Sequence, residues 1–245
     1  MGLGFVYWAF VGLAITLIGN VIYGLLPRKY SLLCGRLILQ KAFQIFINYL
    51  KVTGLLVLDD QDLQQLKTMP GPLIIAPNHI ALWDAVYIIA RIPEVTCIMK
   101  GTILRNPFLG GGAKVAGYIP SDSSVQMLFA ATHKLKKGAK LLLFPEGTRT
   151  RSDALWINPL QAGIGLMAKY SNAAIIPVYI RSNSRFLEKG RPLFLKPEFP
   201  LIISLKVGEP IKFQKMDDVH TFGKKLSDCY IKELSKPHPL RRATH

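Results

Sequence analysis

The sequence predicts an α/β fold, with a mostly parallel sheet flanked by helices and preceded by two membrane-associated helices. Short apolar runs with the pattern of buried strands alternate along the chain with helical patterns, which is typical of a parallel sheet. The polar motifs follow the apolar runs directly, and open α/β sheets place their sites at such strand ends. We therefore divide the chain into membrane-associated helices over 1–51 and an α/β domain over 52–245.

The composition combines a strong positive charge with high hydrophobicity. Among 245 residues, 31 are Lys or Arg and 15 are Asp or Glu, which gives a net charge of +16, while half of the residues are hydrophobic. A disordered basic tail would be poor in apolar residues, and a cytosolic nucleic-acid binder rarely carries this hydrophobicity. The combination favours an anionic membrane surface as a partner. The cysteines, which are Cys34, Cys97 and Cys229, show neither zinc-ligand nor disulfide spacing.

The N-terminal segment 1–27 is apolar and contains no charged residue. As a helix, about 26 residues would extend roughly 39 Å, enough to cross a bilayer or to lie deep in one leaflet. A cleaved signal peptide is the alternative, but a basic start and a small-residue cleavage site are both absent. Arg28 and Lys29 close the apolar run, and the positive-inside tendency then places the following chain on the cytoplasmic side.

The segment 31–51 has the pattern of an amphipathic helix with a narrow polar stripe. Polar side chains recur at every fourth position, and apolar side chains fill most of the remaining surface. The stripe consists of Arg36, Gln40, Gln44 and Asn48. This pattern predicts a helix that lies on the membrane surface, and a helix packed inside the protein is the alternative.

The rest of the chain alternates between the two kinds of element. We expect strands over 52–58, 73–76, 95–99, 117–120, 141–144, 173–180 and 201–207. We expect helices over 83–90, from the capping cluster 121–124 to about Lys137, over 160–170 and over 219–234. The segment 59–69 has helical potential, and 181–200 is a loop rich in Pro and Arg.

His79 and Asp84 follow the buried strand 73–76 and carry the clearest chemical signal. A histidine and a nearby carboxylate are the base and the orienting group that activate a hydroxyl. Five residues turn an ideal helix by about 500°, so the two side chains would not share a helix face. If they meet, His79 must lie in the loop and Asp84 in the helix that follows. The alternative is a loop histidine and a surface aspartate that never touch.

Two further stretches combine cations with glycines or acids. Lys100, Arg105 and Lys114 surround the glycines 110–112, and such a run either holds a phosphate or packs helices closely. Glu146 and Arg149 stand in the segment 145–153, directly after a predicted strand. An arginine can fork two phosphate oxygens, and a glutamate can hold that arginine or accept a substrate hydroxyl. An ordinary surface turn is the alternative.

Three blocks resemble the glycerolipid acyltransferase family. Asn78-His79 through Asp84 resembles its NH-x4-D signature, Phe144 to Arg149 its FPEGTR block, and Ile176 to Val178 its later apolar Pro-Val block. The blocks occur in the family's order and cover roughly residues 55–210. By size and by its apolar N-terminus the chain is most similar to the bacterial 1-acyl-glycerol-3-phosphate acyltransferases, which carry an N-terminal two-helix membrane element.

The resemblance implies a mechanism. His79 would take the proton from the acceptor's hydroxyl, which then attacks an acyl thioester, and Asp84 would orient His79. The substrate-binding residues would be Asn78, Lys100, Arg105, Glu146, Gly147, Thr148 and Arg149. It implies no metal and no cofactor, with acyl-CoA or acyl carrier protein as co-substrate and a lyso-lipid as acceptor. It also places the chain at the bacterial inner membrane, with the catalytic domain on the cytoplasmic side.

One departure from the family pattern concerns the acceptor. The family usually has an Arg after its Gly-x-x-Ile-x block, whereas Gly117 to Pro120 is followed here by Ser121. A missing cation would weaken recognition of a glycerol phosphate, so a lyso-aminolipid or another specialised lipid is an alternative acceptor. A different class of function is the alternative, namely a non-catalytic basic protein that binds anionic lipid or nucleic acid. Nucleic acid is not expected, because the basic residues are dispersed and form no recognition motif.

Overall fold

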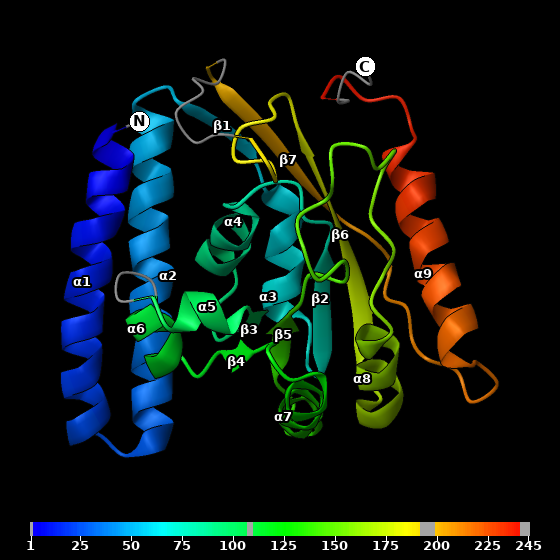
Figure 1. Ribbon diagram of the computed structural model, residues 1–245, viewed down its shortest axis with the longest axis horizontal. Coiled ribbons are helices and arrows are strands. Elements are labelled where there is room, and N and C mark those ends of the chain that lie inside the picture. The colour runs from blue at the N-terminus through cyan, green and yellow to red at the C-terminus, as the bar shows by residue number, and fades with distance from the viewer. Residues whose placement is uncertain (1, 107–109, 192–198, 241–245) are drawn as a thin grey trace.

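The computed structural model describes residues 2–106, 110–191 and 199–240, and over these residues it shows a seven-stranded sheet flanked by helices (Figure 1). The strands lie in the order β1-β7-β6-β2-β5-β3-β4. Their bounds are Leu56–Asp59 for β1, Leu73–Pro77 for β2, Thr96–Met99 for β3, Ile119–Pro120 for β4, Lys140–Leu142 for β5, Ala174–Ser182 for β6 and Leu201–Val207 for β7.

The sheet is mostly parallel, as the alternation of strands and helices predicts. Only β6 and β7 pair in antiparallel orientation, and β7 carries β1 as a parallel edge strand. The four strands β2, β3, β4 and β5, together with β6, therefore point the same way. Their carboxyl ends meet at one edge of the sheet, where such folds bind their ligands.

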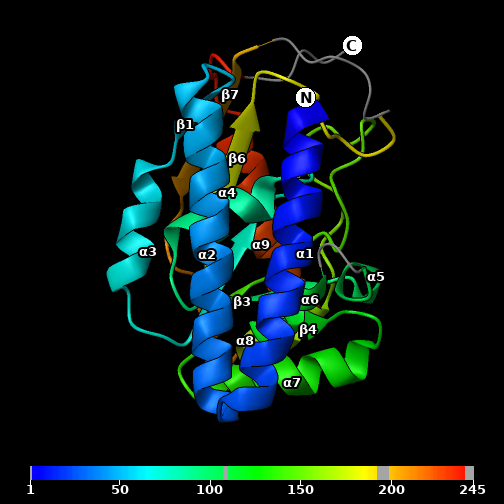
Figure 2. The ribbon, with the colours of Figure 1, turned by 90° about the vertical axis from the view of Figure 1, so that its left-hand side faces the viewer.

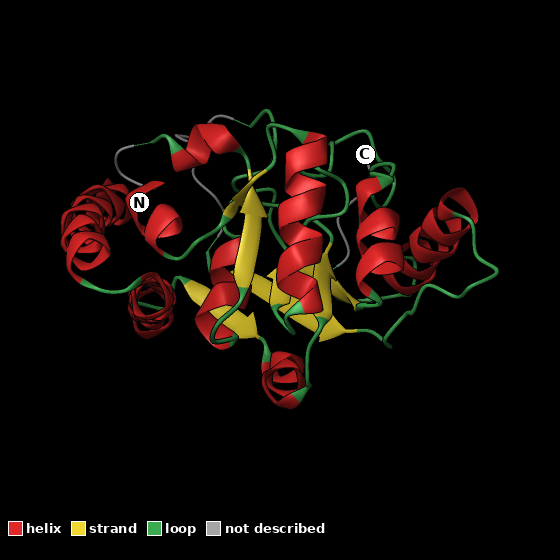
Figure 3. Ribbon diagram, turned by 90° about the horizontal axis from the view of Figure 1, so that it is seen from below, coloured by secondary structure: helices red, strands yellow, loops and turns green. Residues whose placement is uncertain are grey.

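Helices cover both faces of the sheet (Figure 3), and an apolar core lies on each face. Alternate residues of β2 point to opposite faces, so Ile75 belongs to the core under α2 and α4, and Ile74 to the core under α7, α8 and α9. The helices on the first face include α2 (Arg28–Val52) and α4 (Asp84–Arg91). Those on the second face are α7 (Ser124–Lys136), α8 (Gly163–Ser171) and α9 (Val219–Leu234). The short segments η1 (Gln61–Gln64) and α3 (Gln65–Thr68) lie between β1 and β2.

The first two helices form an antiparallel hairpin at one side of the molecule (Figure 2). Helix α1 spans Gly2–Leu25, and α2 packs both on α1 and on α4. Within the described residues, neither of these helices nor any other is long and apolar enough to cross a bilayer. The prediction of an N-terminal membrane element is therefore not supported by a spanning helix.

The polar stripe of α2 faces the protein and not the outside. Gln40 and Gln44 donate through their amide nitrogens to the carbonyl of Ala90, at 3.4 and 2.8 Å. Arg36 donates to the carbonyl of Ala116 at 3.1 Å. The physical reason is that carbonyls at the ends of α4 and of α6 (Gly110–Val115) have no partner within their own helices, and α2 supplies the donors. Only Asn48 of the stripe is exposed.

The glycine run packs helices, which is the second of the two alternatives that the sequence left open. Helix α6 (Gly110–Val115) follows the short helix α5 (Gly101–Leu104) and lies against α1 and α2. A Cβ atom added at Gly111 would lie 2.2 Å from the hydroxyl oxygen of Thr16 on α1. One added at Gly35 of α2 would lie 2.6 Å from the backbone of Val115. Residues 107–109 of the stretch lie outside the described residues.

Candidate active site

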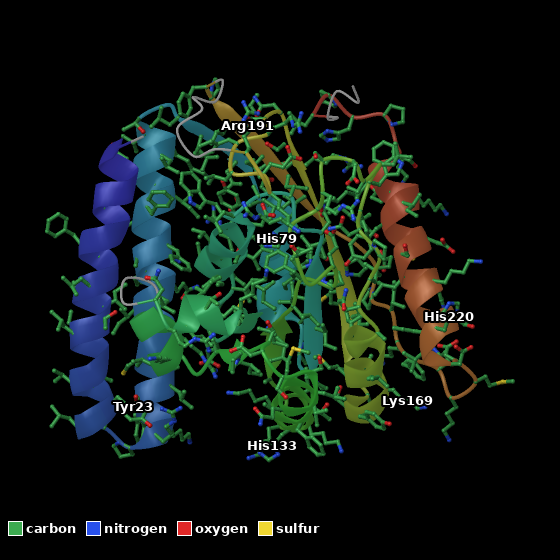
Figure 4. The ribbon with its side chains drawn as sticks, viewed as in Figure 1. Tyr23, His79, His133, Lys169, Arg191 and His220 are labelled. Atoms are coloured by element: carbon green, nitrogen blue, oxygen red, sulfur yellow. The ribbon has the colours of Figure 1, made fainter. Side chains whose placement is uncertain are left out.

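His79 and Asp84 meet at the carboxyl end of β2. His79 lies in the loop after the strand, and Asp84 is the first residue of α4, so the chain turns between them as the five-residue spacing requires. Asp84 Oδ2 lies 2.9 Å from His79 Nδ1 and accepts the backbone N–H of Ala81 at 2.8 Å. The Asp84 side chain is fully buried, whereas 17% of the His79 side chain is exposed. A buried carboxylate thus holds a histidine that solvent or a ligand can reach (Figure 4).

The His79 ring is also held by stacking on an aromatic ring. Its centroid lies 3.9 Å from that of Phe144, and the two ring planes differ by 25°. Nδ1 is engaged by Asp84, while Nε2 makes no hydrogen bond with the described residues. Nε2 is therefore the nitrogen that can exchange a proton with a ligand, and Asp84 would stabilise the ring once it is charged.

Glu146 fastens the loop after β5 to the loop that carries His79. Its Oε1 accepts the backbone N–H of His79 and the hydroxyl of Thr150, both at 2.8 Å. Its Oε2 accepts the backbone N–H of Asn158 at 2.7 Å. The residue is 2% exposed, and burial raises the pKa of its carboxyl group although these hydrogen bonds act to lower it. Since its oxygens are already occupied, Glu146 is placed to position His79 rather than to contact an acceptor.

We expect Glu146→Ala to lower the free energy of unfolding by about 2–4 kcal/mol, because it leaves three donors without their acceptor in a buried place. Chemical denaturation measures the change. Asp153→Ala is the matched control, since this exposed carboxylate lies in the same loop and its one ion pair among the described residues is with Arg151. Equal stability of the two variants would contradict the anchoring position of Glu146.

The raised pKa of Glu146 also gives a pH dependence with a defined sign. The folded protein holds this proton more tightly than the unfolded chain, so stability falls as the pH rises from the ordinary pKa to the raised one. Glu146→Gln cannot titrate. Wild-type stability relative to this variant should therefore increase as the pH is lowered through that window, as denaturation curves at neutral and acidic pH can test.

Asn78 joins β2 to β6 at the level of the site. Its amide nitrogen donates to the carbonyl of Ile180 at 3.0 Å, and its amide oxygen accepts the N–H of Ile180 at 2.7 Å. The side chain is buried, and both of its polar atoms are engaged. We expected Asn78 to bind substrate. In the structure its side chain instead connects the loop of His79 to β6.

Arg149 reaches the loop after β6. Its Nη1 donates to the carbonyl of Leu187 at 2.7 Å, and the N–H of Leu82 donates to the same carbonyl at 3.2 Å. Leu187 is buried and has a φ of +61°, a conformation that L-residues rarely adopt and that is often found near functional sites. One carbonyl therefore links the His79–Asp84 turn, Arg149 and the loop after β6.

The remaining predicted residues lie on the open side of the same sheet edge. Lys100 is exposed at the end of β3 and takes part in no ion pair among the described residues. Arg105 is also exposed, but its Nη1 donates to Asp122 Oδ2 at 2.8 Å, so its charge already has a partner. Gly147 is exposed with a φ of +68°, and Thr148 is half-buried beside it.

Several residues of the site were not predicted from the sequence. Thr150 donates its backbone N–H to the carbonyl of His79 at 2.5 Å, and Asn158 also accepts the N–H of Arg151. Trp83 packs edge-on against Phe186 at a centroid distance of 5.4 Å. The position of Thr150 directly after the FPEGTR block was a usable signal. No sequence pattern points to Asn158 or Phe186.

Comparison with known proteins places these motifs in a family. The family model described as Acyltransferase matches residues 57–181, which is just over half of the chain. A 1-acyl-sn-glycerol-3-phosphate acyltransferase of Saccharomyces cerevisiae is 23% identical over 240 residues, covering 94% of this chain and 78% of that protein. One of Helicobacter pylori is 30% identical over 129 residues, covering 50% of this chain and 54% of that protein.

The chain spans a smaller part of other relatives. It covers 39% of the length of the chloroplastic 1-acyl-sn-glycerol-3-phosphate acyltransferase BAT2 of Brassica napus, to which it is 25% identical over 137 residues. Among solved structures, the 1-acyl-sn-glycerophosphate acyltransferase PlsC from Thermotoga maritima matches with a TM-score of 0.62 and 19% identity, covering 96% of this chain and 97% of that one. The fold is thus shared over nearly the whole chain, and by its motifs and its matched family model the chain belongs to the acyltransferase family.

Proposed function

We propose that the chain transfers a fatty acyl group from a thioester to the free hydroxyl of 1-acyl-sn-glycerol-3-phosphate, which yields phosphatidic acid. The observation that carries the proposal is the 2.9 Å contact between His79 Nδ1 and the buried Asp84 carboxylate at the carboxyl end of β2. The related 1-acyl-sn-glycerol-3-phosphate acyltransferases of Saccharomyces cerevisiae and Helicobacter pylori support the choice of acceptor.

The reaction needs one base and no covalent enzyme intermediate. His79 Nε2 takes the hydroxyl proton of the acceptor while its oxygen attacks the thioester carbonyl carbon. The tetrahedral intermediate then collapses, the carbon–sulfur bond breaks, and the imidazolium returns the proton to the departing thiolate. Asp84 holds the ring through Nδ1 and stabilises its charged form in both steps.

The acceptor would lie against the open side of the loop after β5. Arg149 and Lys100 would hold its phosphate, with Gly147 and Thr148 beside its glycerol, because these groups surround the sheet edge at which His79 lies. Glu146 would act through His79 rather than on the acceptor. The donor is acyl-CoA or acyl carrier protein, and both are acidic partners for a chain of charge +16.

The test is an assay of the purified protein with radiolabelled acyl-CoA or acyl carrier protein and a panel of acceptors. We expect phosphatidic acid from 1-acyl-sn-glycerol-3-phosphate, identified by mass spectrometry. A lyso-aminolipid belongs in the panel because Ser121 stands where the family has an Arg, and Asp122 already neutralises Arg105. If the protein acylates only the lyso-aminolipid, the choice of acceptor is wrong. If it acylates none of the lyso-lipids in the panel, the proposed activity is wrong.

We also propose that the α1–α2 hairpin rests on a membrane with its apolar outer side. Because the polar stripe of α2 faces inward, the outer side of the hairpin is apolar. It exposes Phe10, Leu17, Ile18, Val21, Leu25, Ile45 and Val52, each by more than half of its surface. Such an apolar patch on one face marks an interaction surface, and a cationic chain fits an anionic bilayer.

A double variant, Leu17→Glu with Val21→Glu, should reduce binding to vesicles containing anionic lipid at least tenfold, because two charges would enter the apolar layer. Co-flotation measures binding. Met216→Glu is the control, since Met216 is 99% exposed and shortly precedes α9, a helix that lies on the opposite side of the molecule from α1 and α2 (Figure 1). Unchanged flotation of the double variant would exclude the hairpin as the membrane contact.

A further inference from the structure

A small open cavity adjoins the loop that carries His79. It has a volume of about 50 Å³ and lies between the ends of β2 and β6, the loop after β5 and the end of α9. Asn78 and Ile80, the two sequence neighbours of His79, both line it. Ile80 also belongs to the apolar core that contains α4, so the cavity lies beside the loop of His79.

Arg181 lines this cavity as a buried cation that forms no direct ion pair among the described residues, although the Glu233 carboxylate is near enough to act on its pKa. Its residue surface is 9% exposed. Among the described residues its guanidinium makes one hydrogen bond, from Nη2 to the carbonyl of Glu233 at 2.5 Å. The Glu233 carboxylate is taken by Lys206 and Lys236. A guanidinium offers five N–H donors, and buried charges are normally paired, so Arg181 retains donors for an anion.

The other walls of the cavity are largely apolar. They are formed by Ala154, Leu155, Trp156, Leu234 and Leu240. A site with one buried guanidinium and apolar walls suits an anion attached to a less polar chain, because the walls exclude water from the ion pair. A free metal cation or a basic peptide does not fit it.

We propose that this cavity binds the phosphate at the end of the phosphopantetheine arm of the acyl donor, with Arg181 as its counterion. The arm is the part that coenzyme A and acyl carrier protein share, and it carries the thioester at its other end. The cavity adjoins the residues on both sides of His79, so an arm held there by its phosphate can present its thioester to the base across the edge of β2 and β6. This assignment rests on the proposed acyl transfer and adds the place of the donor to it.

Direct binding tests the site without turnover. Isothermal titration of the His79→Ala protein with coenzyme A, 4′-phosphopantetheine and pantetheine compares ligands with and without the phosphate. We expect both phosphorylated ligands to bind, pantetheine to bind at least tenfold more weakly, and Arg181→Gln to remove this difference. Arg181→Lys should retain part of it, because the charge remains while the planar fork is lost. Lys224→Gln, an exposed cation of α9, is the control and should change nothing.

Steady-state kinetics separate the donor from the acceptor. Arg181→Gln should raise the KM for acyl-CoA and for acyl carrier protein about tenfold or more, with the KM for the acceptor unchanged. Equal binding of pantetheine and its phosphate, a rise in KM for acyl-CoA alone, or a rise for the acceptor would each overturn the assignment. Thermal unfolding shows whether Arg181→Gln is folded, and Arg181→Lys supplies the test if it is not. Because the titrations need no catalysis, they can fail or succeed independently of the proposed reaction.

Discussion

His79→Ala is expected to lower kcat by about 10²–10⁴-fold, the usual contribution of a general base, while the protein stays folded. The reason is that Nε2 of His79 is the ring nitrogen left open to a substrate, since Nδ1 is engaged by Asp84. Initial rates with 1-acyl-sn-glycerol-3-phosphate and saturating acyl donor measure the loss.

The control for this variant is His133→Ala. His133 is exposed near the end of α7, far from His79 in the view of Figure 4, and it should be replaced without loss of activity. Far-ultraviolet circular dichroism and the melting temperature show whether either variant is misfolded. Wild-type turnover by a folded His79→Ala protein would reject the imidazole as the base, whatever the substrate proves to be.

The places of His79 in the loop and Asp84 in the helix, should the two side chains meet, could be predicted because they depend on local chain geometry. A buried strand, a loop and a helix start follow one another over a dozen residues, and the spacing left one way for the side chains to meet. The contact at 2.9 Å confirms that prediction. The helix over 219–234 and the strand over 201–207 were likewise predicted with their observed ends, since strong periodicity and clear caps define them.

The position of Glu146 could not be predicted, because its three partners are set by tertiary folding. Two of the donors are backbone N–H groups, at His79 and Asn158, and backbone groups leave no trace in a sequence pattern. The carboxylate of Glu146 suggested a residue that binds the acceptor, whereas its burial and its hydrogen bonds show that it connects two loops. The position of Asn78 could not be predicted for the same reason, since both of its side-chain polar atoms form hydrogen bonds with the backbone of Ile180 on the neighbouring strand.

The direction in which the polar stripe of α2 faces could not be predicted for a related reason. Periodicity shows that a helix has a polar stripe, but it does not show which way the stripe faces. The free carbonyl of Ala90 at the end of α4 draws Gln40 and Gln44 inward, and the apolar residues are left outside. The first strand also begins later than predicted, at Leu56, because α2 continues to Val52.

Asp84→Asn is expected to lower kcat by about 10²–10⁴-fold, although the new side chain has the same shape. An asparagine at this place can hold the ring, but it cannot stabilise the positive charge that His79 gains when it takes a proton. KM for the acceptor should change little, because Asp84 is fully buried and does not reach a ligand. The separation of kcat from KM distinguishes this effect from a general disturbance of the pocket.

A double-mutant cycle shows whether Asp84 acts through His79. The four proteins are the wild type, His79→Ala, Asp84→Asn and the double variant, each compared by kcat and by melting temperature. If the carboxylate works only by supporting the imidazole, the double variant should be no slower than His79→Ala alone, as for other residues that act as a unit. Independent, multiplied losses would instead mean that Asp84 contributes by another route, such as holding the N–H of Ala81, which it accepts at 2.8 Å. Because that bond fixes the turn between His79 and Asp84, Asp84→Ala would then be less stable than Asp84→Asn. Comparing the two substitutions separates the effect of the lost charge from the effect of the lost hydrogen bond.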